Sequence, residues 1–131
     1  MAVSTNEIQV KWGDSNTSSV AAGAAQDSDS FQMSDGAVYA EIIFKAVNGG
    51  TPADGDSVDF YLRKISDPDQ DSTLDEETVG SFLCQLDISS SATAVKRVCL
   101  PVGFPSCKIH VENNGASSVT VSARVAEKVS S

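Results

Sequence analysis

The chain has 131 residues, 40% of them hydrophobic, and its 18 acidic against 9 basic residues give a net charge of −9. A chain of this length fits one domain with a core of its own, so neither a metal nor a disulfide framework is needed to explain folding. Because the basic residues are scattered along an acidic chain that repels phosphate backbones, nucleic acid is excluded as the expected partner.

The sequence also lacks the signals of membrane insertion and of export. No apolar run approaches the roughly 18 residues that a membrane helix needs, and the first residues lack the basic start and apolar stretch of a signal peptide. The three cysteines, Cys84, Cys99 and Cys107, are an odd number without a CxxC spacing, which predicts neither a disulfide set nor a zinc site. We expect a soluble cytosolic chain with free, mostly buried thiols and no membrane partner; one bridge, such as Cys99–Cys107, stays open.

The N-terminal segment begins with a short pattern of period two. Ile8, Val10 and Trp12 alternate with polar residues, which predicts an amphipathic strand. Residues 13–30 are small and polar and predict a loop or a flexible connector. We therefore divide the chain into an N-terminal strand or arm with its connector, residues 1–30, and a β-sandwich domain, residues 31–131. An arm that reaches an adjacent subunit and a first strand followed by a loop stay open as equal alternatives.

Strand signals become dense after Phe31. Residues 37–47 are apolar on both faces, as expected of a central strand. After a turn rich in glycine, residues 56–65 alternate, and this pattern puts Phe60 on the apolar face and Tyr61 on the polar face.

Four further segments alternate in the same way: residues 79–88, 94–100, 107–112 and 119–125. In the first of them, the alternation assigns Phe82 to the same face as Cys84 and Leu86. The Asn113-Asn-Gly-Ala sequence between the last two segments is typical of a hairpin turn. The total is about seven or eight short strands with regular turn signals, which predicts an all-β fold, an antiparallel β-sandwich of the jelly-roll or Ig-like type.

His110 is the only histidine of the chain, so a histidine-dependent mechanism would have to use it. General acid–base or triad chemistry needs a partner poised beside the ring. The strand pattern puts His110 on the polar face between Lys108 and Glu112, and no nucleophile signature such as GxSxG accompanies it. We therefore expect a solvated strand histidine, no catalytic residue and no enzyme.

The acidic segment 66–77 is the one stretch whose composition suits a metal ion. Four of its acids occupy positions 1, 3, 5 and 9 of an EF-hand-like loop: Asp67, Asp69, Asp71 and Asp75. Ser72 replaces the glycine of that motif, Thr78 replaces its bidentate glutamate, and the flanks are predicted strands. We expect a solvated connection without metal or cofactor, with a weak calcium site as the alternative.

Residues 50–62, Gly-Thr-Pro-Ala-Asp-Gly-Asp-Ser-Val-Asp-Phe-Tyr-Leu, resemble segments of small virion proteins of tailed bacteriophages. The resemblance continues in Asp67-Pro-Asp, in residues 82–87 and in residues 108–114 and 119–123, and it covers roughly residues 10–128. It implies a structural protein, a homo-oligomeric capsid decoration or cement protein that binds the major capsid protein on the capsid exterior and is assembled in the host cytoplasm. The cysteines and residues 21–25 have no counterpart in this resemblance.

Two other functions stay open beside the decoration protein. One is a receptor- or glycan-binding module on a tail or fibre, because β-sandwiches host such sites readily. With aromatic residues at only 6%, Tyr39 and Tyr61 are the outward aromatic candidates by strand phase, and the loops around Asp54 and Asp69 are the first places to test. The other is a hydrolase, which would depend on His110.

Overall fold

Nine strands in two antiparallel sheets form the part of the chain that the computed structural model describes, residues 2–65, 81–102 and 106–130. The larger sheet has the order β1-β9-β4-β7, with β2 on the same edge of β9 as β1. Its strands are β1 (Val3–Gln9), β2 (Ser18–Val20), β4 (Ala37–Asn48), β7 (Thr93–Leu100) and β9 (Val119–Ser130).

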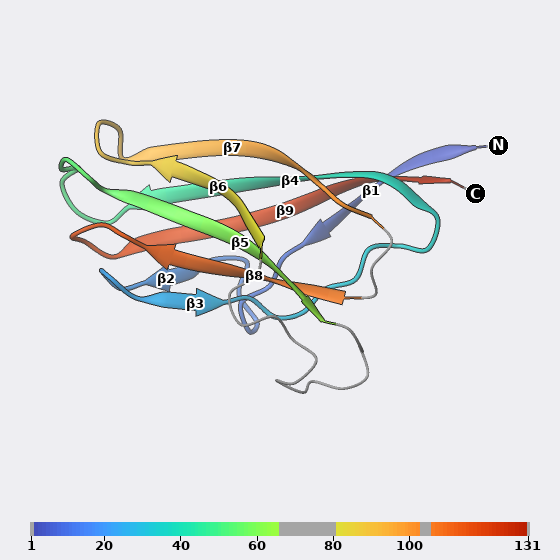
Figure 1. Cartoon of the computed structure of the whole chain (residues 1–131), viewed down its shortest axis with the longest axis horizontal. Helices are drawn as coiled ribbons and strands as arrows, with labels where there is room; N and C mark the ends of the chain where they lie inside the picture. Colours follow the sequence, from blue (N-terminus) through green and yellow to red (C-terminus); the bar gives the residue numbers. More distant parts are fainter. Residues whose placement is uncertain (1, 66–80, 103–105, 131) are drawn as a thin grey trace.

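The smaller sheet has four strands in the order β3-β8-β5-β6. They are β3 (Ala25–Asp27), β5 (Ser57–Ile65), β6 (Ser81–Asp87) and β8 (Ser106–Asn113). Figure 1 shows the two sheets as layers of long strands that run along the same axis of the molecule. The predicted all-β sandwich is confirmed. No helix in the described ranges is long and apolar enough to cross a membrane.

The core lies between the two sheets and is built from the inward side chains of their central strands. β4 is flanked by β9 and β7, which confirms the central strand predicted for residues 37–47. Phe44 of β4 and Phe60 of β5 are fully buried, and their rings stack across the interface with centroids 4.1 Å apart. Such pairs add about 0.5–1.5 kcal/mol to what the burial of their area contributes.

The N-terminal segment belongs to the sandwich over most of its length. β1 pairs with β9 from Val3↔Ser130 to Gln9↔Arg124, so in the single chain it is the first strand of the larger sheet. Residues 13–30, for which the sequence predicts only a loop or connector, contain β2 and β3. These strands are held by backbone pairing to β9 and β8. Because they have only three residues each, their sequences are too short to show the apolar alternation that predicts a strand.

A β-bulge in β6 moves one aromatic side chain from the core to the surface. Phe60 pairs with Cys84 but Tyr61 pairs with Phe82, so Leu83 is an extra residue in β6. An inserted residue reverses the facing of the side chains beyond it. The prediction that Phe82 shares the face of Cys84 and Leu86 is therefore wrong, and 58% of Phe82 is exposed.

All three cysteines are free, and the Cys99–Cys107 bridge that the sequence leaves open is not formed. Cys84 and Cys107 are buried inside the sandwich, whereas Cys99 is exposed on β7. Burial raises the pKa of the Cys84 thiol to about 11 and that of the Cys107 thiol to about 12. The two buried thiols therefore behave as small apolar side chains at neutral pH.

Candidate functional site

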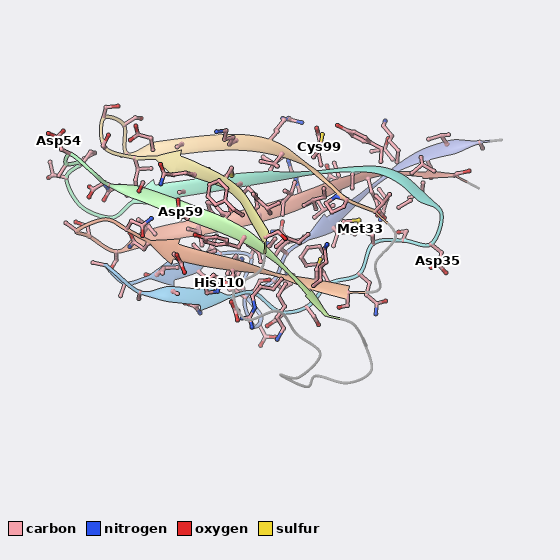
Figure 2. All side chains as sticks on the ribbon, in the orientation of Figure 1. Met33, Asp35, Asp54, Asp59, Cys99 and His110 are labelled. Atoms are coloured by element: carbon pink, nitrogen blue, oxygen red, sulfur yellow. The ribbon has the colours of Figure 1, made fainter. Side chains whose placement is uncertain are left out.

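One side chain from each strand of the smaller sheet lines up across its outer face. The register pairs Asp27 of β3 with His110 of β8, His110 with Tyr61 of β5, and Tyr61 with Phe82 of β6. Because paired residues point to the same face of a sheet, these four side chains form a continuous row, which we call the central row. Figure 2 labels His110 on β8.

His110 is held between two carboxylates. Its Nδ1 lies 2.6 Å from Asp27 Oδ1 and its Nε2 lies 3.2 Å from Glu112 Oε1, and only 12% of its side chain is exposed. Arg63 forms an ion pair with the same Asp27. The outward facing of His110 is as predicted, but the expectation of a solvated ring is wrong. The reason is that Asp27 comes from β3, a strand for which the sequence has no signal.

Tyr61 and Phe82 form the aromatic half of the central row. Their ring centroids lie 5.6 Å apart at an interplanar angle of 71°, so one ring edge meets the other ring's face. The Tyr61 hydroxyl donates to Glu112 Oε2 over 3.4 Å. Burial, and then the nearby carboxylates of Glu112 and Asp59, raise the pKa of Tyr61, so its hydroxyl keeps its proton at neutral pH. Tyr61 is therefore held by contacts with both Glu112 and Phe82, whereas Phe82 is exposed to solvent.

A second row of polar side chains runs next to the central row. The register pairs Glu112 with Asp59 and Asp59 with Gln85, and we call these three residues the polar row. Gln85 Nε2 donates to Asp59 Oδ1 over 2.8 Å, and Asn114 Nδ2 donates to Asp59 Oδ2 over 2.8 Å. Where this row ends, Glu112 and Asn114 line a hollow of about 260 Å³ beside the turn between β2 and β3.

The two rows combine an apolar ring with hydrogen-bonding groups on one face of the smaller sheet. Carboxylates accept hydrogen bonds, and carboxamides both donate and accept them. A ligand rich in hydroxyl groups but with an apolar face matches this set, because it needs a ring to pack against and oxygens to bond. Within residues 2–65, 81–102 and 106–130, no group of three or more histidine, cysteine, aspartate or glutamate residues is arranged to hold a metal ion.

The other residues singled out by the sequence lie elsewhere. Tyr39 faces outward as predicted, but it lies on the larger sheet with its hydroxyl 3.5 Å from Cys99 Sγ, and contacts with Cys99 and then Glu41 raise the pKa of Tyr39 to about 12. Asp54 lies in the turn between β4 and β5, at the tip of the molecule (Figure 2). Asp69 and the whole acidic segment, with its calcium alternative, lie outside the described residues.

The outward position of Phe82 does not follow from the period-two pattern of the sequence. The available signal is the adjacent apolar pair Phe82-Leu83, which interrupts the alternation of β6. Two consecutive apolar residues in an otherwise alternating strand are compatible with a bulge.

No protein-family model matches the chain, and no curated protein matches it. Solved structures do resemble it. The C-terminal carbohydrate-binding module CBM6 of the marine laminarinase LamC from Zobellia galactanivorans has a TM-score of 0.55 at 8% identity, over 93% of this chain and 99% of that one. The CBM36-1 domain of a multidomain xylanase from the hindgut metagenome of Trinervitermes trinervoides has a TM-score of 0.52 at 9% identity. That similarity covers 94% of this chain and 96% of the CBM36-1 domain.

A viral structure shares the fold as well. The structure of the infectious bursal disease virus Gx strain has a TM-score of 0.54 at 12% identity, and the similarity covers 98% of this chain and 33% of that one. At such identities these similarities establish the fold alone, a β-sandwich.

Proposed function

We propose that this protein is a glycan-binding module that holds a saccharide on the outer face of its smaller sheet. The observation that carries the proposal is Phe82. This ring is 58% exposed, lies edge to face with Tyr61, and is aligned with a row of hydrogen-bonding side chains. The bulge turns this ring away from the core, where it offers an apolar surface on which a sugar ring can pack.

The surrounding groups suit sugar hydroxyls. Asp59 and Glu112 offer carboxylate oxygens, and Gln85 and Asn114 offer carboxamides. Each of these side chains is already held by a hydrogen bond, since Gln85 and Asn114 bond to Asp59 and Glu112 bonds to Tyr61, so little conformational freedom is lost when a ligand binds. We infer recognition without histidine-dependent catalysis, because both nitrogens of the only histidine contact carboxylates within the same face.

The similarity in fold to two carbohydrate-binding modules supports this proposal over a purely structural role. A receptor- or glycan-binding module on a phage tail or fibre is the setting that agrees with the resemblance of residues 50–62 to tailed-phage virion proteins.

The capsid decoration protein remains the second candidate. The fold similarity to the infectious bursal disease virus structure favours it, and its partners would be the major capsid protein and further copies of this chain. Cryo-electron microscopy of an intact virion that carries this chain separates the two settings. Density on the shell would support the decoration protein, and density only on the tail or fibre would support the binding module.

The binding test uses the wild-type chain with laminarin, with xylan and on an array of neutral glycans, followed by titration calorimetry of the best ligand. Phe82→Ala is expected to weaken binding by about 10-fold or more, since the burial of a phenylalanine contributes about 1.5–3 kcal/mol. Val95→Ala is the matched control, because Val95 is 60% exposed but lies on β7 of the other sheet.

Both variants are expected to unfold within a few degrees of the wild type, because both side chains are exposed. The proposal fails if the wild type binds no glycan above background. It also fails if Phe82→Ala and Val95→Ala bind the ligand equally well.

A further inference from the structure

The outer face of the larger sheet carries a hollow of its own, away from the two rows described above. Its volume is about 290 Å³, close to the lower limit of about 300 Å³ for small-molecule sites. Side chains from β1, β4 and β9 and from the segment between β1 and β2 surround it. The lining residues are Gln9, Asn16, Thr17, Ile43, Lys45, Ser122, Ala123 and Arg124.

The charge of this hollow is opposite to that of the chain. The described lining holds two cations, Lys45 and Arg124, and no acid, although acidic residues outnumber basic ones 18 to 9 in the sequence. The register pairs Lys45 with Ser122 and Ile43 with Arg124, so the two cations are diagonal neighbours on one face of β4 and β9. Diagonal neighbours lie within reach of one another when their side chains are long.

The two cations differ in their partners. In the part of the chain that the structure describes, Lys45 forms no ion pair, whereas Arg124 forms a long, exposed ion pair with Glu7, its Nε 4.0 Å from Glu7 Oε1. On the same face Arg97 bonds to Glu41 over 2.8 Å. Two like charges side by side repel each other, and an anion between them removes that repulsion.

The rest of the lining is uncharged and fits a sugar ring. Ile43 supplies apolar surface, and Thr17 and Ser122 supply hydroxyl groups, whereas Ala123 is a core residue that is 2% exposed. Gln9 is held in place, because its Nε2 donates to the carbonyl oxygen of Ala123 over 3.0 Å.

We propose that this hollow is a second binding site and takes one acidic sugar residue, a pyranose that bears a carboxylate. The carboxylate would lie between the ammonium group of Lys45 and the guanidinium group of Arg124, which binds planar carboxylates in two-pronged fashion. The ring would pack on Ile43, and its hydroxyls would meet the polar rim. This site lies on the opposite sheet from Phe82 and does not depend on the proposed neutral-glycan face.

The test titrates the full chain with trigalacturonate, with xylotriose as the neutral trisaccharide of equal length. Lys45→Gln and Arg124→Gln are each expected to weaken trigalacturonate binding by about 10-fold or more, as for the loss of a hydrogen bond to a charged group. Lys128→Gln is the matched control, because it removes the same charge from the same face of β9 outside the hollow. It is expected to bind within about two-fold of the wild type, since only screened long-range attraction is lost.

Several results would overturn this proposal. One is xylotriose binding as tightly as trigalacturonate, and another is inorganic sulfate doing so, which would reduce the hollow to a simple anion site. A third is Lys128→Gln losing as much affinity as Lys45→Gln, the mark of unspecific attraction to a basic face. A fourth is a pair of results: the wild type binds no trigalacturonate, and light scattering shows that Lys45→Gln dissociates an oligomer of the chain. An acidic segment of a second copy would then occupy the hollow in place of a sugar.

Failure here is distinguishable from failure of the neutral-glycan site. Phe82→Ala is expected to keep its trigalacturonate affinity while it loses the neutral ligand. Lys45→Gln is expected to do the reverse.

Discussion

A single buried carboxylate joins three segments at one end of the larger sheet. Glu127 of β9 is 1% exposed and accepts hydrogen bonds from Asn6 Nδ2 of β1 over 2.9 Å and from the Ser34 backbone N–H over 3.1 Å. The Ser34 hydroxyl bonds to it as well. We predict that Glu127→Gln destabilises the protein, because the amide that replaces one oxygen is itself a donor and faces these donors.

The size of the effect follows from the bonds that the variant loses. Hydrogen bonds to charged groups contribute about 1.5–3 kcal/mol each, and the glutamine at position 127 keeps only one of two acceptor oxygens. We expect the free energy of unfolding to fall by about 3 kcal/mol, and the Tm by roughly 10 °C for a chain of this size. Glu7→Gln is the control, because Glu7 is an exposed acid with its nearest cation at 4.0 Å, and it is expected to cost under about 0.5 kcal/mol.

The same contacts make this contribution depend on pH. Burial alone would raise the pKa of Glu127, but hydrogen bonds from the Ser34 side chain, from Asn6 and from the Ser34 backbone outweigh it, and the folded pKa lies below the ordinary value of 4.5. A depressed folded pKa means stability that is fully present above pH 4.5 and is lost as the pH falls through the folded pKa. The gap between the wild type and Glu127→Gln is therefore largest at neutral pH and narrows in acid.

The assay is urea unfolding at pH 7 and pH 3, followed by the fluorescence of Trp12, the only tryptophan, which is buried. Comparing the wild type with the variant at each pH cancels the titration of all other groups. The reasoning is refuted if Glu127→Gln is as stable as the wild type at pH 7, or if the gap is unchanged at pH 3.

Two further predictions concern the core and the thiols. Phe44→Ala removes one ring of the stack with Phe60 and is expected to lower the free energy of unfolding by about 3–5 kcal/mol in urea; a loss under about 1 kcal/mol would mean that the stack does not hold the sheets together. A thiol reagent is expected to modify Cys99 alone in the native protein, because burial raises the pKa of Cys84 to about 11 and of Cys107 to about 12, and all three in urea; a second fast-reacting native thiol would contradict this.

The sandwich could be predicted from the sequence because apolar and polar residues alternate along its long strands, and this alternation shows which side chains face the core. The central place of β4 follows from its two apolar faces, and the outward direction of Tyr61 follows from strict alternation in β5. The short strands β2 and β3 could not be predicted, because three-residue strands are specified by the backbone groups of their partners. The alternation of apolar and polar residues reports only on the side chains of one strand and contains no information on backbone pairing with another strand.

The candidate site was only half predictable for the same reason. Alternation puts His110 on the outer face, but its partner Asp27 is 83 residues away in the sequence and belongs to β3. A strict period of two puts Phe82 on the face of Cys84, because it has no allowance for the extra residue by which the bulge reverses the facing. The features that set the site apart from an ordinary sheet surface are therefore tertiary.

The pairing of Val3 with Ser130 brings the two termini together at one end of the molecule (Figure 1). The hairpin turn between β8 and β9 lies at the other end. A tether, a fusion partner or an immobilisation tag attached to either terminus therefore leaves the molecule at the same end. The long axis of the sandwich then points away from the point of attachment. Both outer faces then remain accessible from the side, so the two proposed sites can be displayed together to the same polysaccharide.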